Sequence, residues 1–224
     1  DRILYHLVGY LISQGTDVKN IKENTKNRTK KEFKDYLIEE IKNHVKCQID
    51  DLDYDYDRSK IEKILLLFNI ESIIRNSKEK SLFPFDKYKE DKWSLEHIHA
   101  RNSLGIKDIE IGKSWLLEVK KYILDKNKIE NKSESEYETI ILSIDRLLQT
   151  ENIQVEEFEE IQDKIFAVFG EESNSISNLA LLSGKDNSAL NNNIFPIKRS
   201  RIIERDKLGA FIPICTRNVF LKYY

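Results

Sequence analysis

Apolar residues recur at three- and four-residue spacing along most of this chain, and that spacing predicts amphipathic helices. Gly15, Gly170 and Gly209 fall where helices would stop, and Thr29 or an earlier Asn can cap a helix. A polar connection is expected over residues 16–28. The sequence therefore predicts a mainly α fold, with helices near residues 3–12, 29–48, 59–76, 113–126, 133–149, 153–169 and 196–207.

Two short segments, residues 92–98 and 175–183, break this pattern and are expected as strands. The Phe83-Pro84 pair upstream of the first strand cannot continue a helix, so we expect a boundary near residue 80. Residues 1–80 are then a helical segment, the C-terminal part of a larger upstream domain. Residues 81–224 form a second domain, on which the apolar tail from Phe211 onward should pack.

Composition excludes several classes of protein. Charged residues make up 34% of the chain, against about 25% in typical soluble domains. No apolar run approaches the roughly 18 residues of a membrane-spanning helix. Cys47 and Cys215 are far apart and in no metal-ligand spacing, which favours a cytoplasmic protein. The chain lacks Met and starts inside a helical pattern, so we expect it to be part of a longer protein.

Charge is unevenly distributed along the sequence. The whole chain carries −2, yet residues 173–224 hold eight basic and three acidic side chains, a local charge of +5. A basic segment suits phosphate binding, which is largely electrostatic. Lys198, Arg199 and Arg201 lie in the last expected helix and are candidate DNA contacts; the alternative is a solvated helix face.

Polar residues that could take part in catalysis are concentrated at the two expected strands. Residues 96–99, Glu-His-Ile-His, end the first strand, and several Asn residues accompany the second. Metal-assisted phosphodiester hydrolysis needs oxygen ligands for a hard cation and a base that accepts a proton near neutral pH. Glu96 can supply a carboxylate, Asn187 a neutral oxygen ligand and His97 the base.

Strand geometry leaves two arrangements open at this site. Adjacent residues on a regular strand point to opposite faces, so Glu96 and His97 converge only if the strand ends or bends between them. His97 and His99 share a face without any bend, so a zinc site using this pair is a competing hypothesis.

The alternating Asp residues of 50–58 suggest calcium, but they lack the glycine and final Glu of an EF-hand loop, which favours a solvated loop.

These motifs resemble a known family. Residues 93–100, Trp-Ser-Leu-Glu-His-Ile-His-Ala, followed by residues 176–187, Ile-Ser-Asn-Leu-Ala-Leu-Leu-Ser-Gly-Lys-Asp-Asn, look like a split HNH (ββα-metal) endonuclease motif. The resemblance is to the nuclease domain of GmrSD-type, modification-dependent restriction proteins. It extends over residues 82–224 through Phe83-Pro-Phe-Asp, Phe195-Pro-x-Lys-Arg and the closing Phe-Ile-Pro-x-Cys-Thr-Arg-Asn segment. The helices before it look like the tail of the ParB-like, nucleotide-dependent domain that precedes this nuclease.

The resemblance implies a role for each matching position. His97 corresponds to the general base, and Glu96 and Asn187 to the ligands of a divalent cation, most commonly Mg²⁺, with Mn²⁺ or another divalent ion as alternatives. Asn178 corresponds to the Asn that ties the two strands and orients the base. His99 and Asn102 are expected beside the site. The implied fold is a small ββα-metal core with a helical insertion, residues 103–172, between its strands.

The implied function is DNA hydrolysis in restriction or anti-phage defence. DNA, including modified or phage DNA, and an upstream nucleotide-dependent domain of the same protein are the expected partners, with no membrane. Ala100 stands where many members of the family have Pro, which loosens the turn after His97. The alternative is a non-catalytic helical module that binds nucleic acid or protein and whose nuclease centre has decayed.

Overall fold

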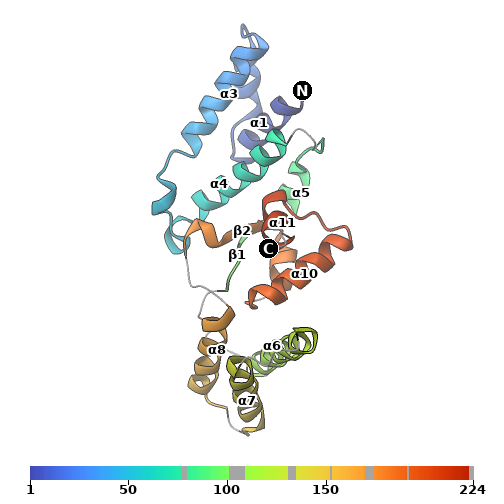
Figure 1. Ribbon diagram of the computed structural model, residues 1–224. Coiled ribbons are helices and arrows are strands. Elements are labelled where there is room, and N and C mark those ends of the chain that lie inside the picture. Colours follow the sequence, from blue (N-terminus) through green and yellow to red (C-terminus); the bar gives the residue numbers. More distant parts are fainter. Residues whose placement is uncertain are drawn as a thin grey trace. The chain divides into compact units, whose positions relative to one another are not determined.

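The computed structural model describes residues 1–76, 80–100, 109–130, 135–151, 153–169, 174–190 and 192–221. These residues form helices and one small two-stranded antiparallel sheet, so the predicted mainly α class is confirmed (Figure 1). No described helix has both the length and the apolar composition needed to cross a bilayer. The chain divides into two compact units, the first built from residues 1–96, 174–189 and 205–224, and the second from residues 97–173 and 190–204.

The first unit combines the N-terminal helices with most of the sheet. Strands β1 (Ser94–His97) and β2 (Leu179–Leu182) pair with each other. Strand β2 is preceded by a 3₁₀ turn, η2 (Ile176–Asn178), and followed by helix α9 (Gly184–Leu190). The other elements are α1 (Arg2–Ser13), α2 (Val18–Thr25), α3 (Lys30–His44), η1 (Ile49–Asp51), α4 (Tyr54–Arg75), α5 (Phe85–Glu90) and α11 (Ile214–Leu221).

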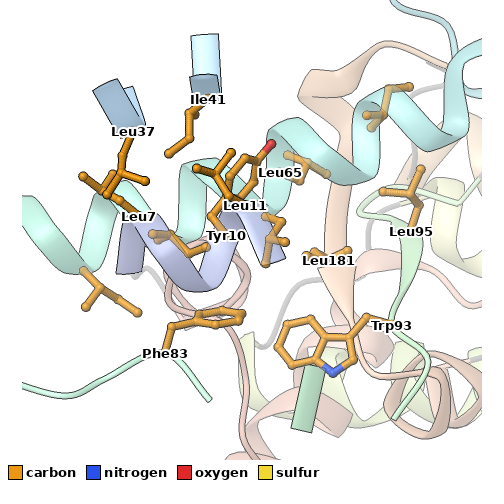
Figure 2. Close-up of a cluster of buried hydrophobic side chains, with 14 of the residues drawn as sticks. Leu7, Tyr10, Leu11, Leu37, Ile41, Leu65, Phe83, Trp93, Leu95 and Leu181 are labelled. Atoms are coloured by element: carbon orange, nitrogen blue, oxygen red, sulfur yellow. The ribbon is translucent and has the colours of Figure 1, made fainter. Parts of the chain in front are cut away.

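One hydrophobic core runs through the N-terminal helices and both strands. Figure 2 shows side chains of α1, α3 and α4 together with Trp93, Leu95 and Leu181 in a single cluster. Phe83 is fully buried in this cluster, and its ring lies 5.8 Å from that of Trp93. Packing therefore continues across the boundary expected near residue 80, because apolar residues from both sides of it fill the same core.

The link between α1 and the segment after residue 80 is tight. Gly9 faces the ring of Phe85 so closely that a Cβ added at Gly9 would lie 2.2 Å from the nearest ring carbon. The hydroxyl of Tyr5 donates to the carbonyl of Phe83 at 3.0 Å. Pro84 does interrupt the helical pattern, as the sequence indicates, but α5 begins immediately after it.

Several elements differ from the sequence-based expectation. The polar connection over residues 16–28 contains α2, which is capped by Asp17 and buries Ile21. The acidic loop is shorter than expected, because α4 already begins at Tyr54 with Asp53 as its cap. The tail beyond Phe211 packs as expected, but as a helix: Thr216 of α11 donates to the carbonyl of Leu181 at 2.7 Å.

The second unit is a helical body with its own core. Helix α7 (Ser135–Gln149) packs against both α6 (Ile109–Glu130) and α8 (Val155–Phe169), as Figure 1 shows. Trp115 of α6 contacts the rings of Phe158 and Phe166 on α8. Helix α10 (Phe195–Lys207) belongs to this unit up to residue 204, and its Ile197 packs in the same core. Three of the predicted helices are thus confirmed within residues 109–169.

Candidate functional site

The candidate site lies where β1 ends and where α9 begins. Glu96, Asn178 and Asn187 belong to the first unit, whereas the boundary between the two units falls after Glu96. His97, His99 and Lys198 belong to the second unit. The geometry on each side of this boundary is therefore described separately.

Local chemistry fixes the first turn of α9. Ser183 and Asp186 form a reciprocal cap, because the Asp186 amide donates to Ser183 Oγ at 3.1 Å and that hydroxyl donates to Asp186 Oδ2 at 2.6 Å. Arg205 pairs with the buried carboxylate of Asp186. Gly184 approaches the turn before β1, and a Cβ there would lie 2.9 Å from the carbonyl oxygen of Lys92. The helix that carries Asn187 is thus anchored at its start.

Asn187 ties this helix to strand β1. Its Nδ2 donates to Ser94 Oγ at 2.7 Å and to the carbonyl of Leu95 at 3.0 Å. Both hydrogen bonds engage the nitrogen of the amide, so the orientation of the side chain is fixed. Within the described part of the chain, Oδ1 receives no hydrogen bond, and it is the atom left to accept one or to coordinate a cation.

Glu96 lies on the same face of β1 as the residue that Asn187 contacts. Leu95 points into the apolar core, and side chains alternate along a strand. Ser94 and Glu96 therefore share the opposite face, and Asn187 lies over that face through its bond to Ser94. Glu96 is 8% exposed. A carboxylate and an amide oxygen on one face are a donor pair that fits a hard divalent cation, the group that the resemblance implies.

Glu96 and Asn187 would supply only part of the ligands of a divalent cation. Among the described residues, no group of three or more His, Cys, Asp or Glu side chains is positioned to hold a metal ion. A site based on Glu96 and Asn187 has one carboxylate and one amide, so the remaining ligands would be oxygens of water and of a phosphate.

Asn178 is placed differently from Asn187. It is the last residue of η2, directly before β2; its backbone amide donates to the carbonyl of Ser175 at 3.0 Å, and its side chain is buried. The hydrogen bonds that join α9 to β1 come from Asn187. Asn187 thus ties α9 to β1, while both roles expected for Asn178, tying the two strands and orienting the base, stay predictions.

His97 is the last residue of β1, and the chain bends at Ile98 and His99. The bend follows His97 rather than separating it from Glu96, so the alternation of the strand directs these two side chains to opposite faces and the expected bend between them is absent. The ammonium group of Lys198, on α10, donates to the carbonyl of His97 at 2.6 Å. Lys198 is fully buried. Its expected role as a DNA contact therefore needs correction: its charge is directed at the backbone of His97 and not at solvent.

His99 packs beside α10. Its imidazole stacks on the ring of Phe195, with centroids 5.0 Å apart and planes 23° apart. The bend at residues 98–99 removes the regular alternation that would place His97 and His99 on one face. Asn102, expected beside the site, lies outside the described residues.

Three arginines of the basic C-terminal quarter form ion pairs within the protein. Arg201 places one Nη within 2.6 Å of both carboxylate oxygens of Glu118 and donates through the other to the carbonyl of Leu190 at 3.0 Å. Arg205 pairs with Asp186, and Arg217 with Asp206. Of the three expected DNA contacts, Arg199 is half-exposed and Arg201 serves an internal ion pair. Asp186 and Asp206 are already counted in the local charge of +5, so only the pair with Glu118 reduces it further.

Two of the alternating Asp residues of segment 50–58 make contacts at the N-terminus of α4. Asp53 Oδ1 accepts from the amide of Asp55 at 2.8 Å, and Asp57 pairs with Lys60 at 2.7 Å. The hydrogen bond from Lys60 lowers the pKa of Asp57. These carboxylates thus serve as helix cap and ion-pair partner.

His6 has a structural role that its place in a helical pattern does not reveal. It is fully buried; its Nδ1 lies 2.7 Å from the carbonyl of Arg2, and its Nε2 accepts from the amide of Phe83 at 3.0 Å. Since Nε2 accepts, Nδ1 carries the proton of the neutral ring. Burial lowers the pKa of His6. A polar residue in the apolar stripe of the first helix was the signal available in the sequence.

Comparison with known proteins found no family model, no curated protein and no solved structure that matches this chain.

Proposed function

We propose that this protein is a divalent-metal-dependent endonuclease of the HNH type, which hydrolyses DNA phosphodiester bonds in restriction or anti-phage defence. The observation that carries the proposal is the fixed amide of Asn187. Its nitrogen is held by β1 next to Glu96, and its oxygen remains as a donor on the face that Glu96 shares. The order and spacing of Glu96, His97, Asn178 and Asn187 along the chain support the same reading.

In this proposal, each residue has one chemical task. Glu96 and Asn187 hold the cation, which when bound supplies positive charge to the scissile phosphate. His97, at the end of β1, takes the proton from the attacking water, as a neutral imidazole can near pH 7. This role requires the imidazole to turn at the strand end toward the face that Glu96 occupies. Lys198 positions the backbone of His97 through its carbonyl. Asn178, immediately before β2, helps to orient the imidazole.

The setting of the proposed reaction is the cytoplasm. Cys47 and Cys215 are both free thiols, as expected for a protein in a reducing compartment. Arg199, together with exposed Lys185 and Lys207, is the remaining candidate for phosphate contacts. The helical insertion, or a nucleotide-dependent domain upstream, would supply the choice of DNA.

The ion pairs of the basic segment favour a second candidate, a non-catalytic helical module with a decayed nuclease centre. Because Arg201, Arg205 and Arg217 are paired with acidic groups, fewer cations are available to bind DNA than the sequence suggests. This alternative predicts no divalent-metal binding and no strand cleavage.

A structural zinc site built on His97 and His99 is a separate hypothesis, and it predicts that zinc copurifies with the protein.

The experiment is plasmid cleavage by the purified protein in Mg²⁺ or Mn²⁺ and in a chelator, with metal analysis of the same preparation. His97→Ala is compared with His44→Ala, a control on an exposed helix surface. The proposal expects metal-dependent nicking by the parent and the control, and loss of nicking in His97→Ala. Equal nicking by all three proteins would remove the catalytic assignment.

A further inference from the structure

The outward face of α2 carries three lysines. Ile21 is the buried residue of this helix and Asn24 is half-buried, so these two residues mark the side that faces the core. With 3.6 residues per turn, Lys19, Lys22 and Lys26 project from the opposite side, within an arc of about 60°. All three side chains are exposed, and Lys26 is the C-cap of the helix.

Arg28 adds a fourth exposed cation at the C-terminal end of α2, and its orientation is fixed. Its Nη1 donates to the carbonyl of Asn24 at 2.6 Å and to Oδ1 of the same residue at 3.0 Å. Its guanidinium lies 4.8 Å from the ring centroid of Tyr36. Within the described chain, Nε and Nη2 have no hydrogen-bonding partner, and together they form a planar edge that can bind a phosphate. We call these four residues the α2 patch: Lys19, Lys22, Lys26 and Arg28.

The positive charges of the α2 patch are not compensated. Among the described residues, no carboxylate forms an ion pair with any of the four side chains. Residues 19–28 hold four basic side chains and one acidic one, Glu23, a local charge of +3. The nearby Glu32 accepts from the amide of Thr29 at 2.7 Å in the capping box of α3. The α2 patch thus differs from the C-terminal quarter, where three arginines are paired with acidic groups.

The lysines at the start of α3 lie on a different surface. Lys30 pairs with Asp1 at 2.7 Å, and Lys31 lines a hollow beside the start of α1. Lys31 is five residues from Tyr36, which places the two side chains about 140° apart around the helix. Because Arg28 lies over Tyr36, the α2 patch is confined to α2 and the turn that follows it.

We propose that the α2 patch binds the phosphate backbone of DNA. Unpaired Lys and Arg side chains suit a polyanion, and contacts of this kind hold DNA without reading its sequence. Two other partners fit this surface less well. Protein interfaces are depleted in Lys. A helix that lies on a membrane presents Trp, Phe or Leu beside its basic residues, whereas the only apolar residues of α2 are Val18 and the buried Ile21.

The proposed role is to hold DNA outside the catalytic centre. In Figure 1, the start of α3, which follows the α2 patch, lies at the end of the first unit remote from β1 and β2. The α2 patch is thus separate from Glu96 and Asn187. The choice of DNA as the nucleic acid rests on the proposed function, so binding is measured without cleavage.

The test is binding of a short labelled DNA duplex, followed by fluorescence anisotropy over a series of salt concentrations in a chelator. The patch variant combines Lys19→Gln, Lys22→Gln and Lys26→Gln. The control variant loses the same charge at three exposed lysines elsewhere, through Lys46→Gln, Lys87→Gln and Lys89→Gln. A third variant keeps the charge of the patch by placing Arg at its three lysine positions. Thermal unfolding of all three variants should match that of the parent, because every substituted side chain is exposed.

The patch variant should bind the duplex at least tenfold more weakly at low salt. Its slope of log Kd against log salt should fall by about two to three, close to one for each lost phosphate contact. The control variant should change the slope by less than about one, and the Arg variant should bind like the parent. A duplex of unrelated sequence should give the same results, because phosphate contacts do not read bases.

Equal slopes and affinities of the patch and control variants would overturn the proposal, as would absence of duplex binding by the parent. Vesicles that contain phosphatidylserine test the membrane alternative. If the patch variant loses vesicle binding but keeps its affinity for DNA, the patch belongs to a membrane contact and the proposal is wrong.

The result is independent of the nuclease assignment, because the chelator prevents metal-dependent cleavage. His97→Ala should bind the duplex with parental affinity. If the parent fails to cleave DNA in Mg²⁺ or Mn²⁺ while the patch variant alone loses affinity, the nuclease proposal fails and the DNA-binding role of the α2 patch stands. If the parent cleaves, the patch variant should raise KM at least tenfold and leave kcat within about threefold of the parent.

Discussion

The buried ammonium group of Lys198 donates a 2.6 Å hydrogen bond to the backbone carbonyl of His97, the residue at which β1 ends. A lysine that the sequence offers as a phosphate contact thus holds the main chain of the proposed base. The two roles differ in how DNA binding responds to salt, because each phosphate contact releases counterions.

Lys198→Met keeps the apolar stem of the side chain and removes its charge. We expect this variant to cleave DNA at least tenfold more slowly, because the backbone of His97 loses its anchor. The slope of log Kd against log salt should not change, whereas loss of a phosphate contact lowers it by about one. Lys31→Met, at an exposed position of α3 outside the basic segment, is the matched control for loss of one charge. A reduced slope in Lys198→Met alone would restore the DNA-contact role.

Substitutions at Asn187 and Ser94 distinguish metal binding by the Asn187 oxygen from the structural role of the Asn187 nitrogen. Asn187→Ala removes two hydrogen bonds to β1 together with the oxygen proposed as a ligand. We expect a loss of about 1–3 kcal/mol in unfolding free energy and at least a tenfold loss of Mn²⁺ affinity, measured by calorimetry. Ser94→Ala removes one partner of Nδ2 and spares the oxygen, so its Mn²⁺ affinity should stay within about threefold of the parent. Equal losses in both variants would show that Asn187 acts only by holding the strand.

Gly9 and Phe85 test whether the N-terminal helices and the sheet share one core. Gly→Ala inside a helix ordinarily stabilises a protein by about 0.5–1 kcal/mol. At Gly9 the added methyl meets the ring of Phe85, so we expect destabilisation of about 1–3 kcal/mol. In a Phe85→Leu background, the cost should shrink, with a coupling energy of about 0.5–3 kcal/mol. Denaturant unfolding of the four proteins gives this coupling, and a stabilising Gly9→Ala would contradict the shared core.

His6 makes stability depend on pH. Burial holds its pKa below the ordinary value of 6.5, and the nearby Arg2 also lowers it, although the hydrogen bond to the Arg2 carbonyl acts in the opposite direction. Below about pH 6.5 the unfolded chain therefore binds a proton that the folded protein does not, and stability falls as pH falls through that window. Above it, this contribution is constant.

His6→Gln preserves an acceptor for the amide of Phe83 without a titrating ring. We expect its unfolding free energy to decline less than that of the parent between about pH 7.5 and pH 5. His44→Gln, on the exposed surface of α3, should retain the decline of the parent. Urea midpoints across this range provide the comparison, and parallel profiles for parent and His6→Gln would contradict the role given to His6.

Local patterns in the sequence predicted many of the elements. Thr29 caps α3, and its side chain and that of Glu32 form a full capping box. The two strands form where apolar runs break the helical period, and they pair. Helix α2 was missed because its only apolar residues are Val18 and Ile21 within a Lys- and Asn-rich stretch. Its Asp17 cap was the available signal.

Charge partners could not be predicted in the same way. Arg201 finds Glu118 on a helix 83 residues earlier in the chain, and Lys198 finds a carbonyl 101 residues earlier. Composition reports how many cations a segment holds, but only the tertiary fold decides which of them reach solvent. For the same reason, motif spacing pointed to Asn187 as a ligand, and its hold on β1 appears only in the fold.

The most direct test of the nuclease proposal is the single-turnover rate of Mn²⁺-dependent plasmid cleavage in His97→Ala and His99→Ala. A general base contributes about 10²–10⁴-fold to the rate. The account predicts a loss of at least a hundredfold in His97→Ala and a change of only a few-fold in His99→Ala, whose ring stacks on Phe195. Cleavage by His97→Ala at the parental rate, or equal losses in both variants with zinc released from each, would contradict it.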